Sequence, residues 1–70
     1  MSDSVYKFIE MVGTSATSWE DAAKNAVDTA AKSLRDLRVA EVKEMDMKLE
    51  NDKVMLFRTV VRLSFKYKGE

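Results

Sequence analysis

The stretch of sequence that decides the fold is MLFRTVVRLSFKY, which occupies residues 55–67. Apolar and polar side chains alternate along it with a period of two, the pattern of a strand that buries one face. One face carries Met55, Phe57, Thr59, Val61, Leu63, Phe65 and Tyr67. The other face carries Arg58, Arg62, Ser64, Lys66 and Lys68, together with Leu56 and Val60. We therefore expect a long strand with one face against the core.

The segment before this strand, residues 39–50, also changes to a period of two. Residues 51–53 (Asn-Asp-Lys) supply turn chemistry, and a loop of this odd length keeps the apolar residues of both strands on one face. The expected cross-strand pairs are Leu49 with Met55, Met47 with Phe57, and Asp46 with Arg58. Ala40 and Val42 have the opposite parity from Met45, which predicts a bulge or bend near residues 43–44.

Towards the N-terminus the sequence predicts one strand and one helix. Residues 5–12 are rich in β-branched and aromatic side chains and precede a glycine, which favours a strand. Ser18 is placed as a helix N-cap, with Asp21 three residues later in the position of a capping box. Lys32 and Arg35 suit the negative end of the helix dipole. The apolar stripe of the predicted helix consists of Trp19, Ala23, Ala26, Val27, Ala30, Leu34 and Leu37.

These segments predict a single α+β domain over residues 1–70, with the order β-α-β-β and a three-stranded antiparallel sheet partly wrapped around one helix. One helix covers only one face of such a sheet. A chain this short removes only about 60% of its unfolded surface from water, and without cysteine it has no disulfide bonds. We therefore expect burial between subunits. The uncovered residues are expected to be Val42, Leu56 and Val60, with either Tyr6 and Phe8 or Ile9 and Met11.

Composition narrows the class of function. The chain has neither cysteine nor histidine, which excludes Ser-His-Asp and Cys-His catalytic units, and we expect no enzyme. Twelve basic and twelve acidic residues give a net charge of zero, so neither nucleic acid nor an anionic membrane is an expected partner. No apolar run approaches the ~20 residues of a transmembrane helix. The polar start, residues 1–4, is unlike a signal peptide and indicates a cytoplasmic protein, with secretion by an atypical route left open.

Candidate functional residues each have a structural explanation beside the functional one. Trp19 is expected to be a packing anchor rather than a platform for stacking a ligand. Glu44 and Asp46 point to one side of a strand and are candidate ligands of a hard cation, although Asp46 is also expected to pair with Arg58. The basic row of the last strand offers phosphate contacts, but nearby acidic residues favour a solvated or inter-subunit salt-bridging face. Residues 13–15 lack the rest of a P-loop.

An ordered set of short motifs along nearly the whole chain resembles the dodecin family. The motifs are Val5-Tyr6-Lys7, Gly13-Thr14-Ser15, Ser18-Trp19-Glu20, Ala22-Ala23, Leu34-Arg35, Glu41-Val42 and Phe65. The resemblance implies a hollow homododecamer built from trimers, with sheets facing inward and helices outward. Typical members hold flavin, as riboflavin or FMN, in stacked pairs, and they store or buffer this ligand rather than act as enzymes.

The family's flavin positions are substituted in this chain. Flavin dodecins typically have tryptophan where this chain has Val39, glutamine where it has Arg58, and an Arg-Gly pair where it has Asp46-Met47. Valine lacks the aromatic face that stacks on a flavin ring, and an Asp46–Arg58 pair satisfies its own charges. The resemblance therefore implies a shell for a small ligand whose flavin site, at Val39, Asp46 and Arg58, is altered.

Part of the sequence looks more like the branch called calcium dodecins, which are described as small secretory calcium-binding proteins. The similar residues are 17–20 and 38–40, followed by Val42, Glu44 and the pair Asp46-Met47. Calcium takes about six to eight oxygen ligands, and Glu44, Asp46 or residues 14–18 are candidates to supply some of them, including across subunits. A calcium-binding shell is thus one alternative function, and a structural or interaction assembly without a ligand is another.

Overall fold

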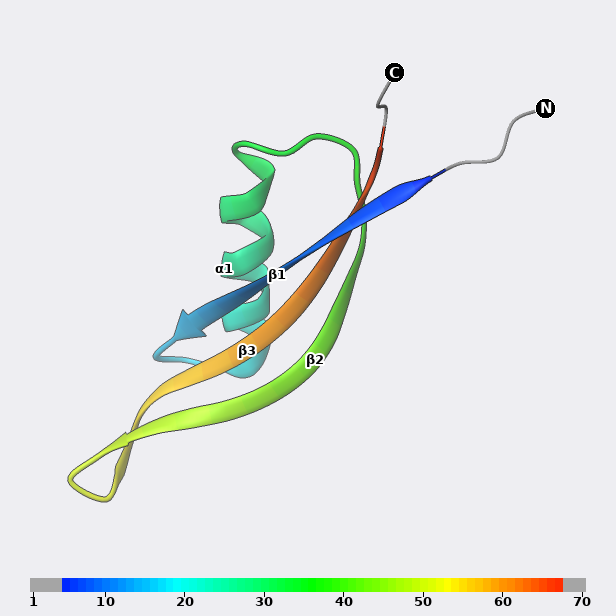
Figure 1. The fold of residues 1–70 in the computed structure, drawn as a ribbon. Coiled ribbons are helices and arrows are strands. Elements are labelled where there is room, and N and C mark those ends of the chain that lie inside the picture. The colour runs from blue at the N-terminus through cyan, green and yellow to red at the C-terminus, as the bar shows by residue number, and fades with distance from the viewer. Residues whose placement is uncertain (1–4, 68–70) are drawn as a thin grey trace.

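The computed structural model describes residues 5–67, so the expectations that concern residues 1–4 and Lys68 lie outside the described residues. Strand β1 (Tyr6–Ser15) leads into helix α1 (Trp19–Ala31), and strands β2 (Leu37–Glu50) and β3 (Lys53–Lys66) follow (Figure 1). The sheet is antiparallel with the order β1-β3-β2, and α1 lies against one of its faces. The predicted α+β fold with the order β-α-β-β is confirmed.

The core is small and lies between α1 and the central strand β3. Val61 and Leu63 are fully buried against Ala26 and Ala30 of the helix. Alanine lets the helix approach the sheet closely, and the closest approach is at Gly13, where an added Cβ would collide with the carbonyl oxygen of Ala22. Ile9 and Met11 pack beside this core, which leaves Tyr6 and Phe8 as the exposed pair of β1.

The helix begins as predicted. The hydroxyl of Ser18 accepts a hydrogen bond from the backbone N–H of Asp21 at 3.0 Å. In a capping box the side chain of Asp21 would accept a hydrogen bond from the backbone N–H of Ser18. Here its carboxylate instead accepts a hydrogen bond from the Ser15 hydroxyl at 2.7 Å. That hydroxyl in turn accepts from the N–H of Thr17 at 2.9 Å. The hydroxyls of this loop are therefore engaged in shaping the turn and the helix start.

The helix is shorter than predicted, since it ends at Ala31 and not at Leu37. Leu34 packs against the core from the connection that follows, and Leu37 is the first residue of β2. Both residues pack against the core from backbone that is not helical. Because core contacts require apolar side chains, their positions happened to continue the apolar spacing of the helix. Lys32 is the C-cap and so lies at the helix end, as predicted, whereas Arg35 lies beyond it; no basic residue stands in the last turn itself.

The turn of the hairpin has two residues instead of the predicted three. Asn51 and Asp52 have φ angles of 53° and 62°, the left-handed conformation of a type I′ turn. Leu49 consequently pairs with Val54, and the predicted Leu49–Met55 pair is wrong because Met55 becomes an extra residue on β3. The other two predicted pairs, Met47 with Phe57 and Asp46 with Arg58, are confirmed.

The predicted irregularity near residues 43–44 is confirmed. Val42 pairs with Val61 and Glu44 pairs with Val60, so Lys43 is the extra residue of a β-bulge. The bulge turns Val42 to the helix side, beside buried Val61, and the expectation that it lies on the opposite face is wrong. Val42 remains 51% exposed because α1 lies over β1 and β3 and hardly over β2.

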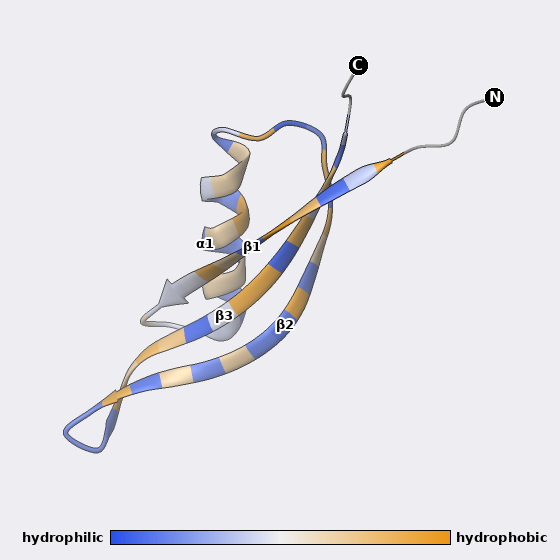
Figure 2. Ribbon diagram, in the orientation of Figure 1, coloured by the Kyte–Doolittle hydropathy of each residue, from blue (hydrophilic) through white to orange (hydrophobic). Residues whose placement is uncertain are grey.

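The molecule is elongated, with principal extents of 56 × 20 × 16 Å. The β2–β3 hairpin curves past the end of α1 and projects beyond it (Figure 1). Along β2, hydrophobic and hydrophilic residues alternate over most of the strand (Figure 2). Within residues 5–67 no helix has the length and apolar character needed to cross a bilayer.

Candidate functional site

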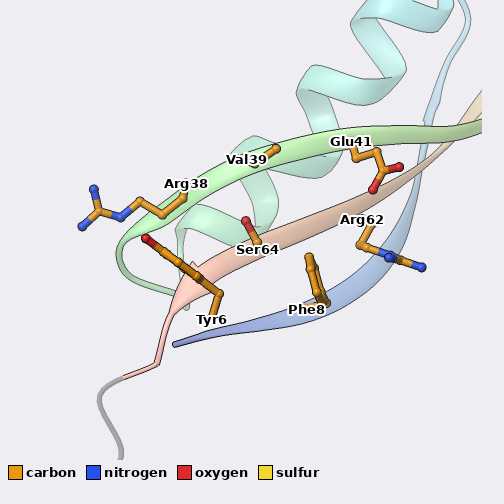
Figure 3. A pocket seen from close by; sticks show the side chains of 7 residues that line it. All are labelled: Tyr6, Phe8, Arg38, Val39, Glu41, Arg62 and Ser64. Carbon is orange, nitrogen blue, oxygen red and sulfur yellow. The ribbon is translucent and has the colours of Figure 1, made fainter. Parts of the chain in front are cut away.

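A groove of about 400 Å³ opens on the sheet face away from α1, and all three strands contribute to it (Figure 3). Its lining consists of Tyr6 and Phe8 from β1, Arg38, Val39 and Glu41 from β2, and Arg62 and Ser64 from β3. The volume lies within the range of small-molecule sites, roughly 300–1,000 Å³.

The hollow results from one small residue between two larger ones. Ser64 of the central strand pairs with Phe8 on one side and with Val39 on the other. Paired residues of adjacent strands place their side chains on the same face, so Phe8 and Val39 form walls and Ser64 forms a floor. Phe8 is 60% exposed and Val39 61% exposed, whereas Ser64 is buried. The walls are therefore apolar surfaces that this chain does not cover.

Charged side chains of both signs surround these walls. The guanidinium of Arg62 lies 5.1 Å from the centre of the Phe8 ring, a cation–π contact. Its Nε atom is 3.5 Å from a carboxylate oxygen of Glu10. Glu41 pairs with Arg62 across β2 and β3, and Arg38 extends at the outer side of β2 (Figure 3). The groove thus combines apolar walls with donors and acceptors at its rim.

A second polar feature on the same sheet face is the Asp46–Arg58 pair. The Arg58 Nε donates to one carboxylate oxygen at 2.7 Å and Nη2 donates to the other at 2.9 Å. These hydrogen bonds and the positive charge of Arg58 lower the pKa of Asp46, and Asp46 correspondingly raises the pKa of Arg58. Both carboxylate oxygens of Asp46 accept hydrogen bonds from Arg58. The pair would therefore have to separate before Asp46 could bind a ligand in the same direction.

The structure brings together some of the predicted site residues and separates others. Val39, Asp46 and Arg58 all lie on the sheet face away from α1, as their pairing with β3 shows. Asp46 and Arg58 are adjacent, but Val39 pairs with Ser64, six positions along β3 from Arg58, or about 20 Å. A single chain therefore does not gather these three residues into one pocket.

The predicted metal ligands share a face but do not form a complete site. Glu44 pairs with Val60 and lies on the same side of the sheet as Asp46. In the part of the chain that the structure describes, no group of three or more acidic side chains gathers that could hold a metal ion. The oxygens of Asp46 are also bonded to Arg58. Glu44 and Asp46 of one chain are thus too few for calcium.

Trp19 is a packing anchor, as predicted. Its ring meets Phe57 in an edge-to-face contact, with 5.0 Å between the centroids, and its Nε1 donates to the backbone oxygen of Asp46 at 2.9 Å. The hydroxyl of Thr59 donates to the backbone oxygen of Trp19 at 3.0 Å. Trp19 therefore holds the start of α1 in contact with β2 and β3. It does not line the groove.

Sequence reasoning did not identify Arg38, Glu41 and Ser64 as lining residues. The signal that places them was present in the predicted bulge at residues 43–44. Once Lys43 is counted as an extra residue, Val39 and Glu41 fall on the same face as the even-numbered residues of β3. The small size of Ser64 between two large neighbours is the second part of that signal.

A curved three-stranded sheet around one short helix, with a groove of ligand size on its open face, defines a small β-α-β-β binding domain. The Dodecin family model matches residues 5–68. The chain belongs to the dodecin family.

Relatives within the family include proteins of two kinds. The chain is 48% identical over 63 residues to the calcium dodecin of Mycobacterium tuberculosis, covering 90% of this chain and 89% of that one. A crystal structure of that protein, described as a calcium-chelating antigen with a novel calcium-binding site, has a TM-score of 0.83 at 44% identity, with 94% of each chain covered. The dodecin of Streptomyces coelicolor has a TM-score of 0.92 at 31% identity, with both chains fully covered.

Proposed function

We propose that this chain assembles into a hollow homododecamer, built from trimers, that binds and stores a small ligand without catalysing a reaction. Membership of the dodecin family supports the architecture. The observation that carries the ligand is the groove between Phe8 and Val39, whose apolar walls are open in the single chain. The cytoplasmic location remains a prediction from the sequence.

The surface of the single chain supports assembly. Among residues 5–67, twelve large apolar side chains expose between 44% and 61% of their surface. Five apolar residues within residues 5–67 are buried, and three of them are alanines, namely Ala22, Ala26 and Ala30. Alanine contributes little apolar surface, so the free energy gained by burial within one chain is small. Further burial between copies is the available source of stability.

Flavin, as riboflavin or FMN, is the first ligand class to test because the family resemblance implies it. The residues at the family's flavin positions fit it poorly: Val39 offers no ring for stacking, and the donors of Arg58 are bonded to Asp46. Tyr6 and Phe8 supply aromatic surface at the groove instead. We therefore propose a ligand with an apolar body and a polar edge, for which flavin is a probe.

Calcium is the second candidate, and the similarity to the Mycobacterium tuberculosis calcium dodecin favours it. Glu44 and Asp46 lie on the open face of the sheet, which faces inward in the proposed shell. Acidic groups from two or more copies would be needed to reach a calcium coordination number of about six to eight. Asp46 would in addition have to leave Arg58.

Native mass spectrometry of the purified protein tests the proposal. We expect a mass of about twelve subunits together with any retained ligand. A monomer or dimer at micromolar concentration would contradict the shell. Because the measurement reports subunit number and bound mass together, it separates a filled shell from a ligand-free assembly.

Two titrations then distinguish the ligand classes. Quenching of flavin fluorescence by the protein supports a flavin site, and the double variant Val39→Trp with Arg58→Gln should bind flavin more tightly than the native chain. Calorimetry with calcium, against protein treated with a chelator, tests the second candidate. Asp46→Asn should weaken calcium binding only if this carboxylate is a ligand, and Asp28→Asn on the exposed side of α1 is the matched control.

A further inference from the structure

Three methionine side chains gather on one face of the β2–β3 hairpin. Met45 and Met47 lie two positions apart on β2, and Met55 lies on β3 two positions before Phe57, the cross-strand partner of Met47. Each methionine exposes between 44% and 58% of its surface. The chain has neither cysteine nor histidine, so its thioethers are its softest metal-ligating groups. The face that carries three of its five methionines is therefore the place to look for a soft metal ion.

The strand register sets the spacing of the three thioethers. Residues two apart on one strand share a face and lie about 7 Å apart, which is the spacing of Met45 and Met47. Met55 precedes Leu56, whose partner Lys48 lies on the open face, so Met55 faces the helix side together with Met47. As diagonal neighbours these two are about 7–8 Å apart. Methionine is unbranched and flexible, so sulfur atoms at these spacings can turn towards a shared ion.

Trp19 adds an aromatic ring to the same place. Its Nε1 donates at 2.9 Å to the backbone oxygen of Asp46, the residue between Met45 and Met47. Its ring also contacts Phe57, which pairs with Met47. These two contacts hold the indole beside the β2 thioethers. An indole face attracts a cation through its ring quadrupole, so the tryptophan favours a positively charged ligand at this point.

We propose that Met45, Met47 and Met55 form a binding site for the soft monovalent cation Cu(I), with Trp19 beside the ion. Thioether sulfur selects Cu(I), whereas calcium and magnesium take oxygen ligands. The site lies on the helix side of the sheet, opposite Glu44 and the carboxylate of Asp46, so it is separate from the calcium candidate. It goes beyond the proposed function and does not depend on the assembly of a shell.

Leucine substitutions distinguish this site from an apolar surface that merely happens to contain methionine. Leucine is close to methionine in volume and is also apolar, but it has no sulfur. Met45→Leu, Met47→Leu and Met55→Leu therefore keep the packing of the hairpin and remove one ligand each. Met11→Leu is the matched control, because Met11 packs beside the core under α1 and is not part of the hairpin.

The experiment titrates the purified protein with silver nitrate in a buffer free of chloride, since Ag(I) is a soft monovalent probe that is not readily oxidised. Calorimetry gives the dissociation constant, and quenching of Trp19 fluorescence reports an ion next to the indole. We expect Met47→Leu to raise the dissociation constant for Ag(I) about 10-fold or more, because even changes outside the ligand shell weaken metal binding by about 10–100-fold. Met11→Leu should bind like the wild type, and excess calcium should not displace Ag(I).

Circular dichroism and native mass spectrometry of the same samples keep folding and assembly apart from metal binding. Native affinity in a Met45→Leu, Met47→Leu double variant would overturn the site, as would a wild type that does not bind Ag(I) at micromolar concentration. Equal weakening by Met11→Leu and Met47→Leu would also overturn it. An assembled wild type without Ag(I) binding leaves the shell standing, whereas a monomeric wild type that binds Ag(I) through the hairpin supports the site and contradicts the shell.

Discussion

Arg58 and Asp46 bind each other through two short hydrogen bonds on the open face of the hairpin. Such a two-point pair fixes both side chains in one orientation. Its side chains are nearly half exposed, so water screens the charges and the pair acts more through geometry than through energy. The Arg58 guanidinium consequently occupies the space directly beside the Asp46 carboxylate.

The Asp46–Arg58 pair should make the free energy of unfolding fall at acidic pH. The pKa of Asp46 is lowered in the folded chain below its ordinary value of 3.8, mainly by hydrogen bonds from Arg58. The contribution of the pair is therefore complete above about pH 4 and is lost as the pH falls through the lowered pKa. We expect Asp46→Asn to be less stable than wild type at pH 7, and the difference to shrink in acid. Urea unfolding at several pH values measures it, and a difference that grows on acidification would contradict the prediction.

Gly13 makes the closest contact between sheet and helix. Its φ angle is not positive, so the reason for glycine here is space and not conformation. We expect Gly13→Ala to destabilise the chain by about 1–3 kcal/mol, because the methyl group meets the backbone carbonyl of Ala22, which cannot move like a side chain. Thermal unfolding measures the loss. Thr14→Ala, at the exposed next position, is the control and should change stability by less.

At the scale of elements, the hairpin shows what a period of two can and cannot predict. The alternation located both strands, and the Asp46–Arg58 pair followed from it. The length of the turn could not be predicted in this way. The alternation required an odd number of residues between the two apolar faces, and the structure meets this requirement with a two-residue turn plus one extra residue, Met55, on β3. The helix end was missed for a related reason. Leu34 keeps the helical spacing of apolar residues while packing on the core from a connection that is not helical.

The turn itself offers an element-scale prediction. Asp52 adopts φ 62°, a left-handed conformation in which glycine avoids the steric penalty of Cβ. Asp52→Gly should therefore stabilise the hairpin. The expected net gain is about 0.5 kcal/mol, because the relief of the left-handed strain exceeds the entropy that glycine loses on folding. Asp52→Ala should destabilise it, since alanine has neither glycine's freedom nor the local hydrogen bonding of aspartate. Chemical unfolding of the two variants gives both signs, and equal stabilities would contradict the type I′ argument.

At the scale of the whole molecule, the groove was harder to predict than the fold. Its walls come from two strands that are distant in sequence, and its floor is a serine whose importance lies in being small. No sequence motif marks such walls and floor, and the charged residues at the rim are brought together only by the pairing of the strands. The sequence indicated that one sheet face would be uncovered, but both faces carry exposed apolar rows, since α1 leaves β2 bare.

Two uncovered faces predict that stability depends on protein concentration. Copies that bind the folded chain and not the unfolded one raise the unfolding temperature by mass action. We expect the midpoint of thermal unfolding to rise by several degrees between about 1 and 100 µM protein. Leu49→Lys should unfold at a lower temperature with little dependence on concentration. A wild-type midpoint that is the same at all concentrations would argue against stabilisation by assembly.

The bulge at Lys43 has a consequence for how this fold varies. Upstream of it, β2 supplies Val39 and Glu41 to the groove; downstream, it supplies Met45 and Met47 to the opposite face. Val60 and Val61 are consecutive on β3, so deleting Lys43 would leave Val42 and Glu44 as neighbours in a regular ladder, with the facing of both halves of β2 kept. Lys43 is therefore an insertion that the sheet absorbs without changing which β2 side chains line the groove. A deletion elsewhere in β2, where every residue has a partner on β3, would instead turn the side chains on one side of it to the opposite face.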